Sequence, residues 1–134
     1  KESVADESRW QALYPLASPG FSLLSGDDET FVRAMIGGAH GVISVASNAV
    51  PATFARICRY VSEQNFDAAL ALDGQLQELY AFLGVEPNPV PIKAIMKLLG
   101  FGRGLRLPLL SLSDDYTGKA DEMTDLCKTI EQSM

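Results

Sequence analysis

The chain has 134 residues, of which 47% are hydrophobic, and this is enough apolar material to bury a core without disulfides. Eleven lysines and arginines against seventeen aspartates and glutamates give a formal net charge of −6. Such a charge repels phosphate backbones and anionic membrane surfaces, so we expect neither a nucleic acid nor a membrane as partner. Cys58 and Cys127 stand far apart without a Cys/His cluster, which argues against a disulfide framework or structural zinc. This cysteine usage favours a reducing compartment, and we expect a cytoplasmic protein.

The first part of the chain alternates short apolar runs with helical patterns. A helix is predicted between Asp6 and Tyr14, before Pro15, and further helices over 29–36 and 51–64. Two apolar runs, 21–25 and 41–46, predict buried strands. Strands that are apolar throughout and separated by amphipathic helices are typical of parallel sheets with crossover helices. The sequence therefore predicts an α/β fold, either a barrel or a doubly wound sheet.

From Phe66 onward the pattern is helical only. Apolar spacing predicts one long helix over 66–83, a second over 92–99 and a last one over 123–130, with an extended leucine-rich passage at 105–112. We therefore expect two parts, 1–64 with the strands and 65–134 as a helical extension. Two strands are too few for a stable parallel sheet, and the first residue is Lys1 rather than Met. We expect a fragment that pairs with further material.

Four stretches are more specific than periodicity: Leu-Leu-Ser-Gly-Asp-Asp at 23–28, Gly-Val-Ile-Ser-Val-Ala-Ser-Asn at 41–48, Glu-Pro-Asn-Pro-Val-Pro-Ile-Lys at 86–93 and Leu-Arg-Leu-Pro at 105–108. Their order and spacing resemble the C-terminal half of the dihydrodipicolinate synthase family, within the superfamily of pyruvate-dependent class I aldolases and N-acetylneuraminate lyase. The resemblance implies the C-terminal half of a (β/α)8 TIM barrel followed by a helical extension, a homotetramer, and a complementary N-terminal half as partner.

The resemblance also implies a reaction. Family members condense pyruvate with L-aspartate 4-semialdehyde to 4-hydroxy-tetrahydrodipicolinate in lysine and diaminopimelate biosynthesis. Lys1 corresponds to the lysine that forms the Schiff base with pyruvate, at the end of the sixth strand, and Gly26 and Ile43 correspond to residues lining the pyruvate pocket. No cofactor is implied beyond this covalent imine, and no metal. The tyrosine proton relay and the residues that hold the substrate carboxylates precede the lysine in the family, so we expect the chain alone to be inactive.

Other interpretations remain open at the level of sequence. The same scaffold and lysine serve N-acetylneuraminate lyase and keto-deoxy-sugar aldolases, although the segment 86–89 favours the first assignment. A non-catalytic chain that completes a split barrel is the alternative from a different class. Locally, Ser25 to Asp28 predicts a strand-to-helix turn in which an aspartate caps the helix, and a divalent metal at Asp27, Asp28 and Glu29 is the weaker alternative. His40 is expected in a capping or surface role.

Overall fold

A computed structural model describes all 134 residues, and the chain divides into two compact units. Unit 1 contains Lys1–Val45 and Ala55–Gln75, and unit 2 contains Ala46–Phe54 and Leu76–Met134. These units differ from the two parts predicted from the sequence, 1–64 as part of a barrel and 65–134 as a helical extension. That division concerns the complete barrel and stays a prediction. None of the helices combines the length and the apolar composition needed to cross a membrane.

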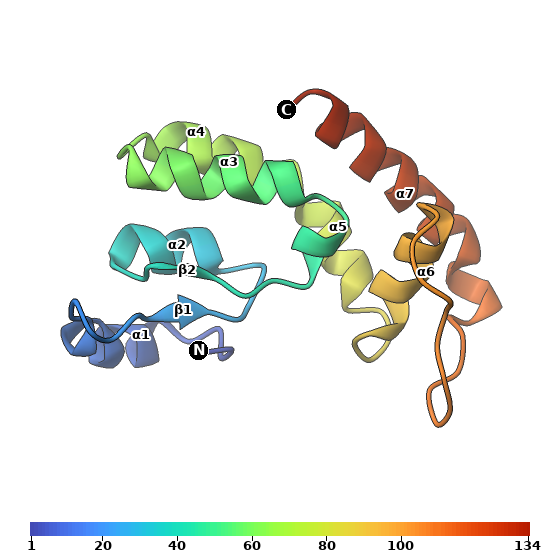
Figure 1. Ribbon diagram of the computed structural model, residues 1–134, viewed down its shortest axis with the longest axis horizontal. Helices are drawn as coiled ribbons and strands as arrows, with labels where there is room; N and C mark the ends of the chain where they lie inside the picture. The colour runs from blue at the N-terminus through green and yellow to red at the C-terminus, as the bar shows by residue number, and fades with distance from the viewer. The chain divides into compact units, whose positions relative to one another are not determined.

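Unit 1 alternates helices with two short parallel strands (Figure 1). Its elements are α1 (Glu7–Leu13), β1 (Leu24–Ser25), α2 (Phe31–Gly37), β2 (Gly41–Val42), most of α3 (Pro51–Ser62) and α4 (Phe66–Gly74). The predicted helices around residues 6–14, 29–36 and 51–64 are confirmed within a few residues, and Asp6 caps α1 by accepting a hydrogen bond from the Ser8 N–H at 2.9 Å. Both strands are found where predicted but are shorter, because only two residues of each form the ladder.

The core of unit 1 lies between its helices and the strands. Trp10 of α1 packs with Leu23, which precedes β1, and with Ala34 of α2. Trp10 also stacks on Tyr14, with ring centroids 5.7 Å apart. Since Trp10 is 3% exposed and Leu23 is 7% exposed, this side of the strands is closed by α1 and α2.

Unit 2 is helical. Its elements are the 3-10 turn Ala46–Asn48, α5 (Gln77–Leu83), α6 (Val90–Leu98), a 3-10 turn at Asp114–Tyr116 and α7 (Thr117–Gln132). The helices α5, α6 and α7 contact one another and bury apolar residues that include Leu79, Ile95 and Met123. The segment 99–113, orange in Figure 1, runs from α6 to the turn before α7 as a long loop, in agreement with the extended passage predicted there.

The single long helix predicted over 66–83 is wrong. The chain forms α4 and α5 instead, separated by Gln75 and Leu76. Gly74 at the end of α4 weakens the helix there, because glycine loses more backbone freedom in a helix than other residues do. The break also separates two buried faces, because Leu72 belongs to unit 1 whereas Leu76 belongs to unit 2. Helical spacing in the sequence continues across the break and conceals it.

A carboxylate at the end of α7 caps the start of α3 within unit 2. Glu131 accepts hydrogen bonds from the N–H of Ala52 at 3.0 Å, from the N–H of Thr53 at 2.8 Å and from the Thr53 hydroxyl at 2.6 Å. The first N–H groups of a helix have no partner within the helix, and they favour a negative charge. Thr53 is fully buried, so its N–H and hydroxyl have no water as an alternative partner, whereas Ala52 is exposed.

We predict that Glu131→Ala lowers the free energy of unfolding by about 1–2 kcal/mol, because it removes a helix cap and leaves buried donors unpaired. Glu131→Gln keeps one acceptor oxygen and should cost less. The matched control is Glu122→Ala in the same helix, since Glu122 makes only an exposed ion pair with Lys119 and should cost less than about 0.5 kcal/mol. Chemical denaturation measures all three, and equal effects of Glu131→Ala and Glu122→Ala would contradict the cap.

Candidate active site

Three chain segments run side by side as parallel strands. In the ladder, Leu24 lies opposite Gly41 and Ser25 lies opposite Val42. On the other side of β1, Glu2 forms a parallel bridge with Ser25. The carboxyl ends of parallel strands lie at the same edge of a sheet, so residues that are far apart in the sequence come together there.

Hydrogen bonds fix the ends of these segments. The N–H of Glu2 donates to the carbonyl of Leu24 at 2.9 Å, and the N–H of Gly26 donates back to the carbonyl of Glu2 at 2.7 Å. On the other side, the N–H of Ile43 donates to the carbonyl of Ser25 at 2.8 Å. The three residues selected from the sequence, Lys1, Gly26 and Ile43, are therefore on three adjacent segments at one edge.

These three residues also share a face of the sheet. Neighbours in register point to the same side, and successive residues along a strand alternate between sides. Glu2 and Ser25 are in register and point toward the helices, where Ser25 is fully buried. Lys1, Gly26 and Ile43, each one position away from this register, belong to the opposite face. Ile43 is 51% exposed, so that face is open in this chain.

Lys1 lies directly over Gly26. A methyl group added at Gly26 would overlap Cε of Lys1 and Oγ of Ser3, and it would come within 3.0 Å of Cγ of Lys1. The absence of a side chain at Gly26 therefore makes room for the aliphatic part of the lysine. The sequence pattern identified Gly26 and Lys1 but gave no indication that they touch.

The acidic turn after β1 binds its own backbone. Asp27 accepts hydrogen bonds from the N–H of Thr30 at 3.0 Å and from the Thr30 hydroxyl at 2.6 Å, which closes the predicted strand-to-helix turn. The predicted aspartate cap is wrong, because α2 begins later, after Thr30, and has no side-chain cap. Asp28 accepts a hydrogen bond from the N–H of Val45 at 3.1 Å. This second bond joins the turn after β1 to the segment after β2, next to Ile43. No pattern in the sequence indicated the pairing of Asp28 with Val45.

An ion pair and a hydrogen bond at Glu2 hold the segment that follows Lys1. The guanidinium of Arg9 in α1 pairs with Glu2, whose other carboxylate oxygen accepts a hydrogen bond from the N–H of Val4 at 2.9 Å. The hydrogen bond from Arg9, followed by that from Val4, holds the pKa of the Glu2 carboxyl below its ordinary value. Sequence reasoning missed Arg9, because the irregular residues between it and Glu2 have no periodicity that would place them together.

His40 lies at the opposite end of the strands. The imidazole Nδ1 of His40 accepts a hydrogen bond from the backbone N–H of Leu23 at 3.0 Å, and the backbone N–H of His40 donates to the carbonyl of Leu23 at 2.7 Å. His40 is also exposed, so the predicted capping or surface role is confirmed. The imidazole is therefore not brought to the edge where Lys1 lies.

The comparisons with known proteins agree with this arrangement. The model of the dihydrodipicolinate synthetase family matches residues 1–127. The chain belongs to this family. It is 45% identical over 123 residues to the 4-hydroxy-tetrahydrodipicolinate synthase of Stenotrophomonas maltophilia, covering 92% of this chain and 41% of that protein. The synthase of the same name from Xylella fastidiosa is 40% identical over 131 residues, covering 98% of this chain and 43% of its own length.

Solved structures of the family show the same fold. The dihydrodipicolinate synthase of Aquifex aeolicus matches with a TM-score of 0.87 at 34% identity, over 93% of this chain and 43% of that one. The synthase of Acinetobacter baumannii, solved as a complex with pyruvate, matches with a TM-score of 0.87 at 29% identity, over 96% and 44% of the two chains. The fold is therefore that of part of an α/β aldolase-type enzyme. The chain spans about two fifths of the length of the curated relatives it matches.

We predict that Gly26→Ala displaces the lysine more than it destabilises the fold. The overlapping atoms are the ends of flexible side chains, so the cost in unfolding free energy should stay below about 1 kcal/mol. NMR of labelled lysine should show a changed ¹³Cε environment for Lys1. Gly20→Ala is the matched control, since a methyl group there has no neighbour within 4 Å. An unchanged Lys1 signal in Gly26→Ala would contradict the contact.

A second prediction concerns pH. The pKa of Glu2 is lowered in the folded chain, so its tie to Arg9 stabilises the fold above the ordinary carboxyl pKa and is lost as the pH falls through the lowered value. Arg9→Met should raise the pKa of Glu2 toward the ordinary value, as measured by ¹³C NMR titration of the carboxyl group. Asp6 is the internal control, because its pKa is lowered mainly by hydrogen bonds from Ser8. Equal changes at Glu2 and Asp6 would argue against a specific pair.

Proposed function

We propose that this chain supplies the last three strands and the helical extension of a (β/α)8 barrel, and that the complete barrel is a class I aldolase-type lyase. Its reaction would be the condensation of pyruvate with L-aspartate 4-semialdehyde to 4-hydroxy-tetrahydrodipicolinate, a step of lysine and diaminopimelate biosynthesis. The observation that carries the proposal is the position of Lys1 over Gly26, at the carboxyl edge of three parallel segments. Active sites of such barrels lie at this edge.

The open face of the strands supports the half-barrel. One face is closed by α1 and α2, whereas the face with Lys1, Gly26 and Ile43 is partly exposed. In a complete barrel that face points inward and is filled by side chains from the other strands. The complementary N-terminal half is therefore the partner we propose. Assembly of complete barrels into a homotetramer stays a prediction.

The chemistry uses the ε-amine of Lys1. A neutral amine attacks the C2 carbonyl of pyruvate, and loss of water gives an imine. The imine withdraws electrons, so a proton leaves the methyl carbon and an enamine forms. The enamine carbon then attacks the aldehyde carbon of the semialdehyde, forming the new carbon–carbon bond and a hydroxyl group. The amino group of the former semialdehyde then attacks the imine carbon, which closes the ring and releases the lysine amine. The groups that move these protons would come from the complementary half, so we propose that the chain alone does not turn over.

Gly26 and Ile43 would form the wall of the pyruvate pocket on this side. Gly26 leaves room for the bound lysine, and the exposed side chain of Ile43 offers an apolar surface for the pyruvate methyl group. The hydrogen bonds of Asp27 and Asp28 would hold the two loops that carry this wall.

The choice of aldehyde rests on the relatives. The matched curated proteins are named 4-hydroxy-tetrahydrodipicolinate synthase, and the synthase from Acinetobacter baumannii was solved with pyruvate. These names favour L-aspartate 4-semialdehyde over the substrates of N-acetylneuraminate lyase and keto-deoxy-sugar aldolases. A non-catalytic role in a split barrel is the outcome that the experiment below would reveal.

We predict that pyruvate with borohydride leaves a reduced adduct on the Lys1 side chain when the chain is assembled with the complementary half. Tandem mass spectrometry must place the adduct, because Lys1 also carries the α-amine of this chain. Lys1→Arg keeps the charge and the α-amine but should abolish the side-chain adduct. Candidate aldehydes, supplied after imine formation, then identify the second substrate. An adduct confined to the α-amine, or unchanged in Lys1→Arg, would refute the Schiff-base role.

A further inference from the structure

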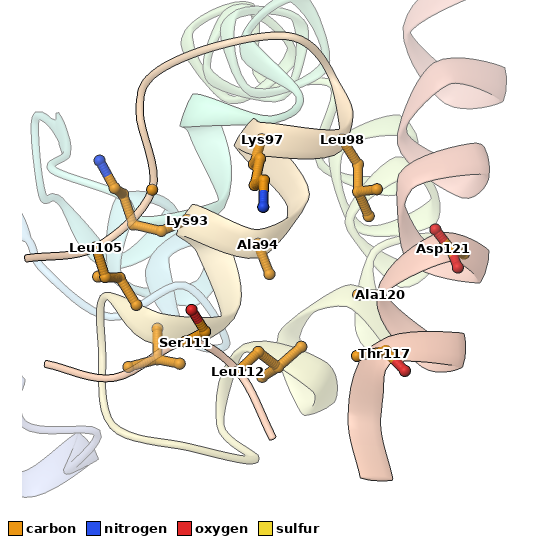
Figure 2. Close-up of a pocket in the computed structure, with 12 residues that line it drawn as sticks. Lys93, Ala94, Lys97, Leu98, Leu105, Ser111, Leu112, Thr117, Ala120 and Asp121 are labelled. Atoms are coloured by element: carbon orange, nitrogen blue, oxygen red, sulfur yellow. The ribbon is translucent and has the colours of Figure 1, made fainter. Parts of the chain in front are cut away.

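Unit 2 contains a pocket of about 270 Å³ between α6, the loop that follows it and α7 (Figure 2). It shares no residue with the candidate active site. A pocket of this volume suits a small organic ligand rather than a single ion or water molecule.

The wall of this pocket is mostly apolar. The side chains that form it include Ala94 and Leu98 from α6, Leu105 and Leu112 from the loop and Ala120 from α7. Such a wall offers few hydrogen bonds, so a sugar or another polyhydroxy compound would lose its hydration without replacement. The body of a suitable ligand must therefore be apolar.

Lys97, an exposed residue, lines this pocket. In Figure 2 the Nζ of Lys97 points from α6 into the pocket, whereas the Nζ of Lys93 points away from it. Lysines on the neighbouring helix have carboxylate partners, as in the pairs of Lys119 with Glu122 and Lys128 with Asp125. The ammonium groups of Lys97 and Lys93 have no hydrogen bond or ion pair in the structure, and only that of Lys97 points into the pocket. Its positive charge is therefore available to a ligand.

The loop adds further donors. The hydroxyl of Ser111 points into the pocket in Figure 2, and the backbone N–H groups of Ser111 and Leu112 have no partner in the structure. Across from them, Asp121 of α7 contributes a negative charge to the rim. One inward amine with neutral donors suits a single carboxylate, and Asp121 disfavours a ligand with two negative charges.

We propose that this pocket is a binding site for a small organic monocarboxylate with a compact apolar body, whose carboxylate pairs with Lys97 and whose body lies against Ala94, Leu98 and Leu112. The site is separate from the pyruvate pocket proposed above. Its ligand is larger and more apolar than pyruvate.

The probe for this site is phenylacetate, which has ten non-hydrogen atoms, titrated into the full chain alone and together with the complementary half. Calorimetry gives Kd, and backbone NMR shifts locate the probe. Shifts should concentrate in 90–98, 104–112 and 117–121. Binding should persist in Lys1→Arg, which separates this result from any failure of the proposed enzyme function. Loss of binding on assembly with the complementary half would overturn the proposal.

Two lysine variants provide the matched comparison. Lys97→Met removes the inward amine and should weaken binding by about tenfold or more, whereas Lys93→Met, on the same helix, should change Kd by less than about threefold. The neutral isostere phenylacetamide should bind about tenfold more weakly than phenylacetate. Circular dichroism checks that each variant is folded, and Ala94→Leu, which fills the pocket, provides a second way to abolish binding. Equal effects of the two lysine variants, or equal binding of the amide, would refute the carboxylate site.

Discussion

The parallel pairing of Glu2 with β1, and of β1 with β2, is the interaction on which the rest of unit 1 depends. A slip of one residue in this register would exchange the two faces of a strand. Gly26 would then face the helices, and Ser25, which is now fully buried, would face Lys1. The backbone hydrogen bonds at Glu2, Gly26 and Ile43 thus determine which side chains meet at the carboxyl edge.

The two faces of these strands differ in burial: one packs against helices, and the other is partly exposed. Apolar contacts of Trp10 and Leu23 supply stability on the helical face, since burying large side chains contributes the most favourable part of the folding free energy. On the other face, the aliphatic part of Lys1 lies over Gly26, and Ile43 is half exposed. The polar tie of Glu2 to Arg9 lies on the helical side, so it holds the lysine segment without occupying the open face.

Local patterns in the sequence predicted the elements that are stabilised locally. Apolar spacing placed the helices predicted over 51–64 and 92–99 within a few residues of the observed bounds of α3 and α6. The break between α4 and α5 could not be predicted from spacing. It arises because Leu72 is buried in unit 1 whereas Leu76 is buried in unit 2, and both positions fit one helical pattern. The cap of α3 by Glu131 was also hidden, since its partners are 78 and 79 positions away. Motif resemblance identified Lys1, Gly26 and Ile43, whereas the approach of Lys1 and Ser3 to Gly26 and the pairs Glu2–Arg9 and Asp28–Val45 required the folded chain.

The last helix, α7, takes part in the packing of unit 2, in the cap of α3 and in the wall of the pocket. One side of α7 packs against α5 and α6, its residue Glu131 caps the start of α3, and Thr117, Ala120 and Asp121 line the pocket. Because the pocket exists only when α6 and α7 are packed together, a ligand bound there would stabilise this packing by mass action. The same packing holds Glu131 at the N–H groups of Ala52 and Thr53. Within unit 2, α7 is thus joined by hydrogen bonds to the beginning of α3.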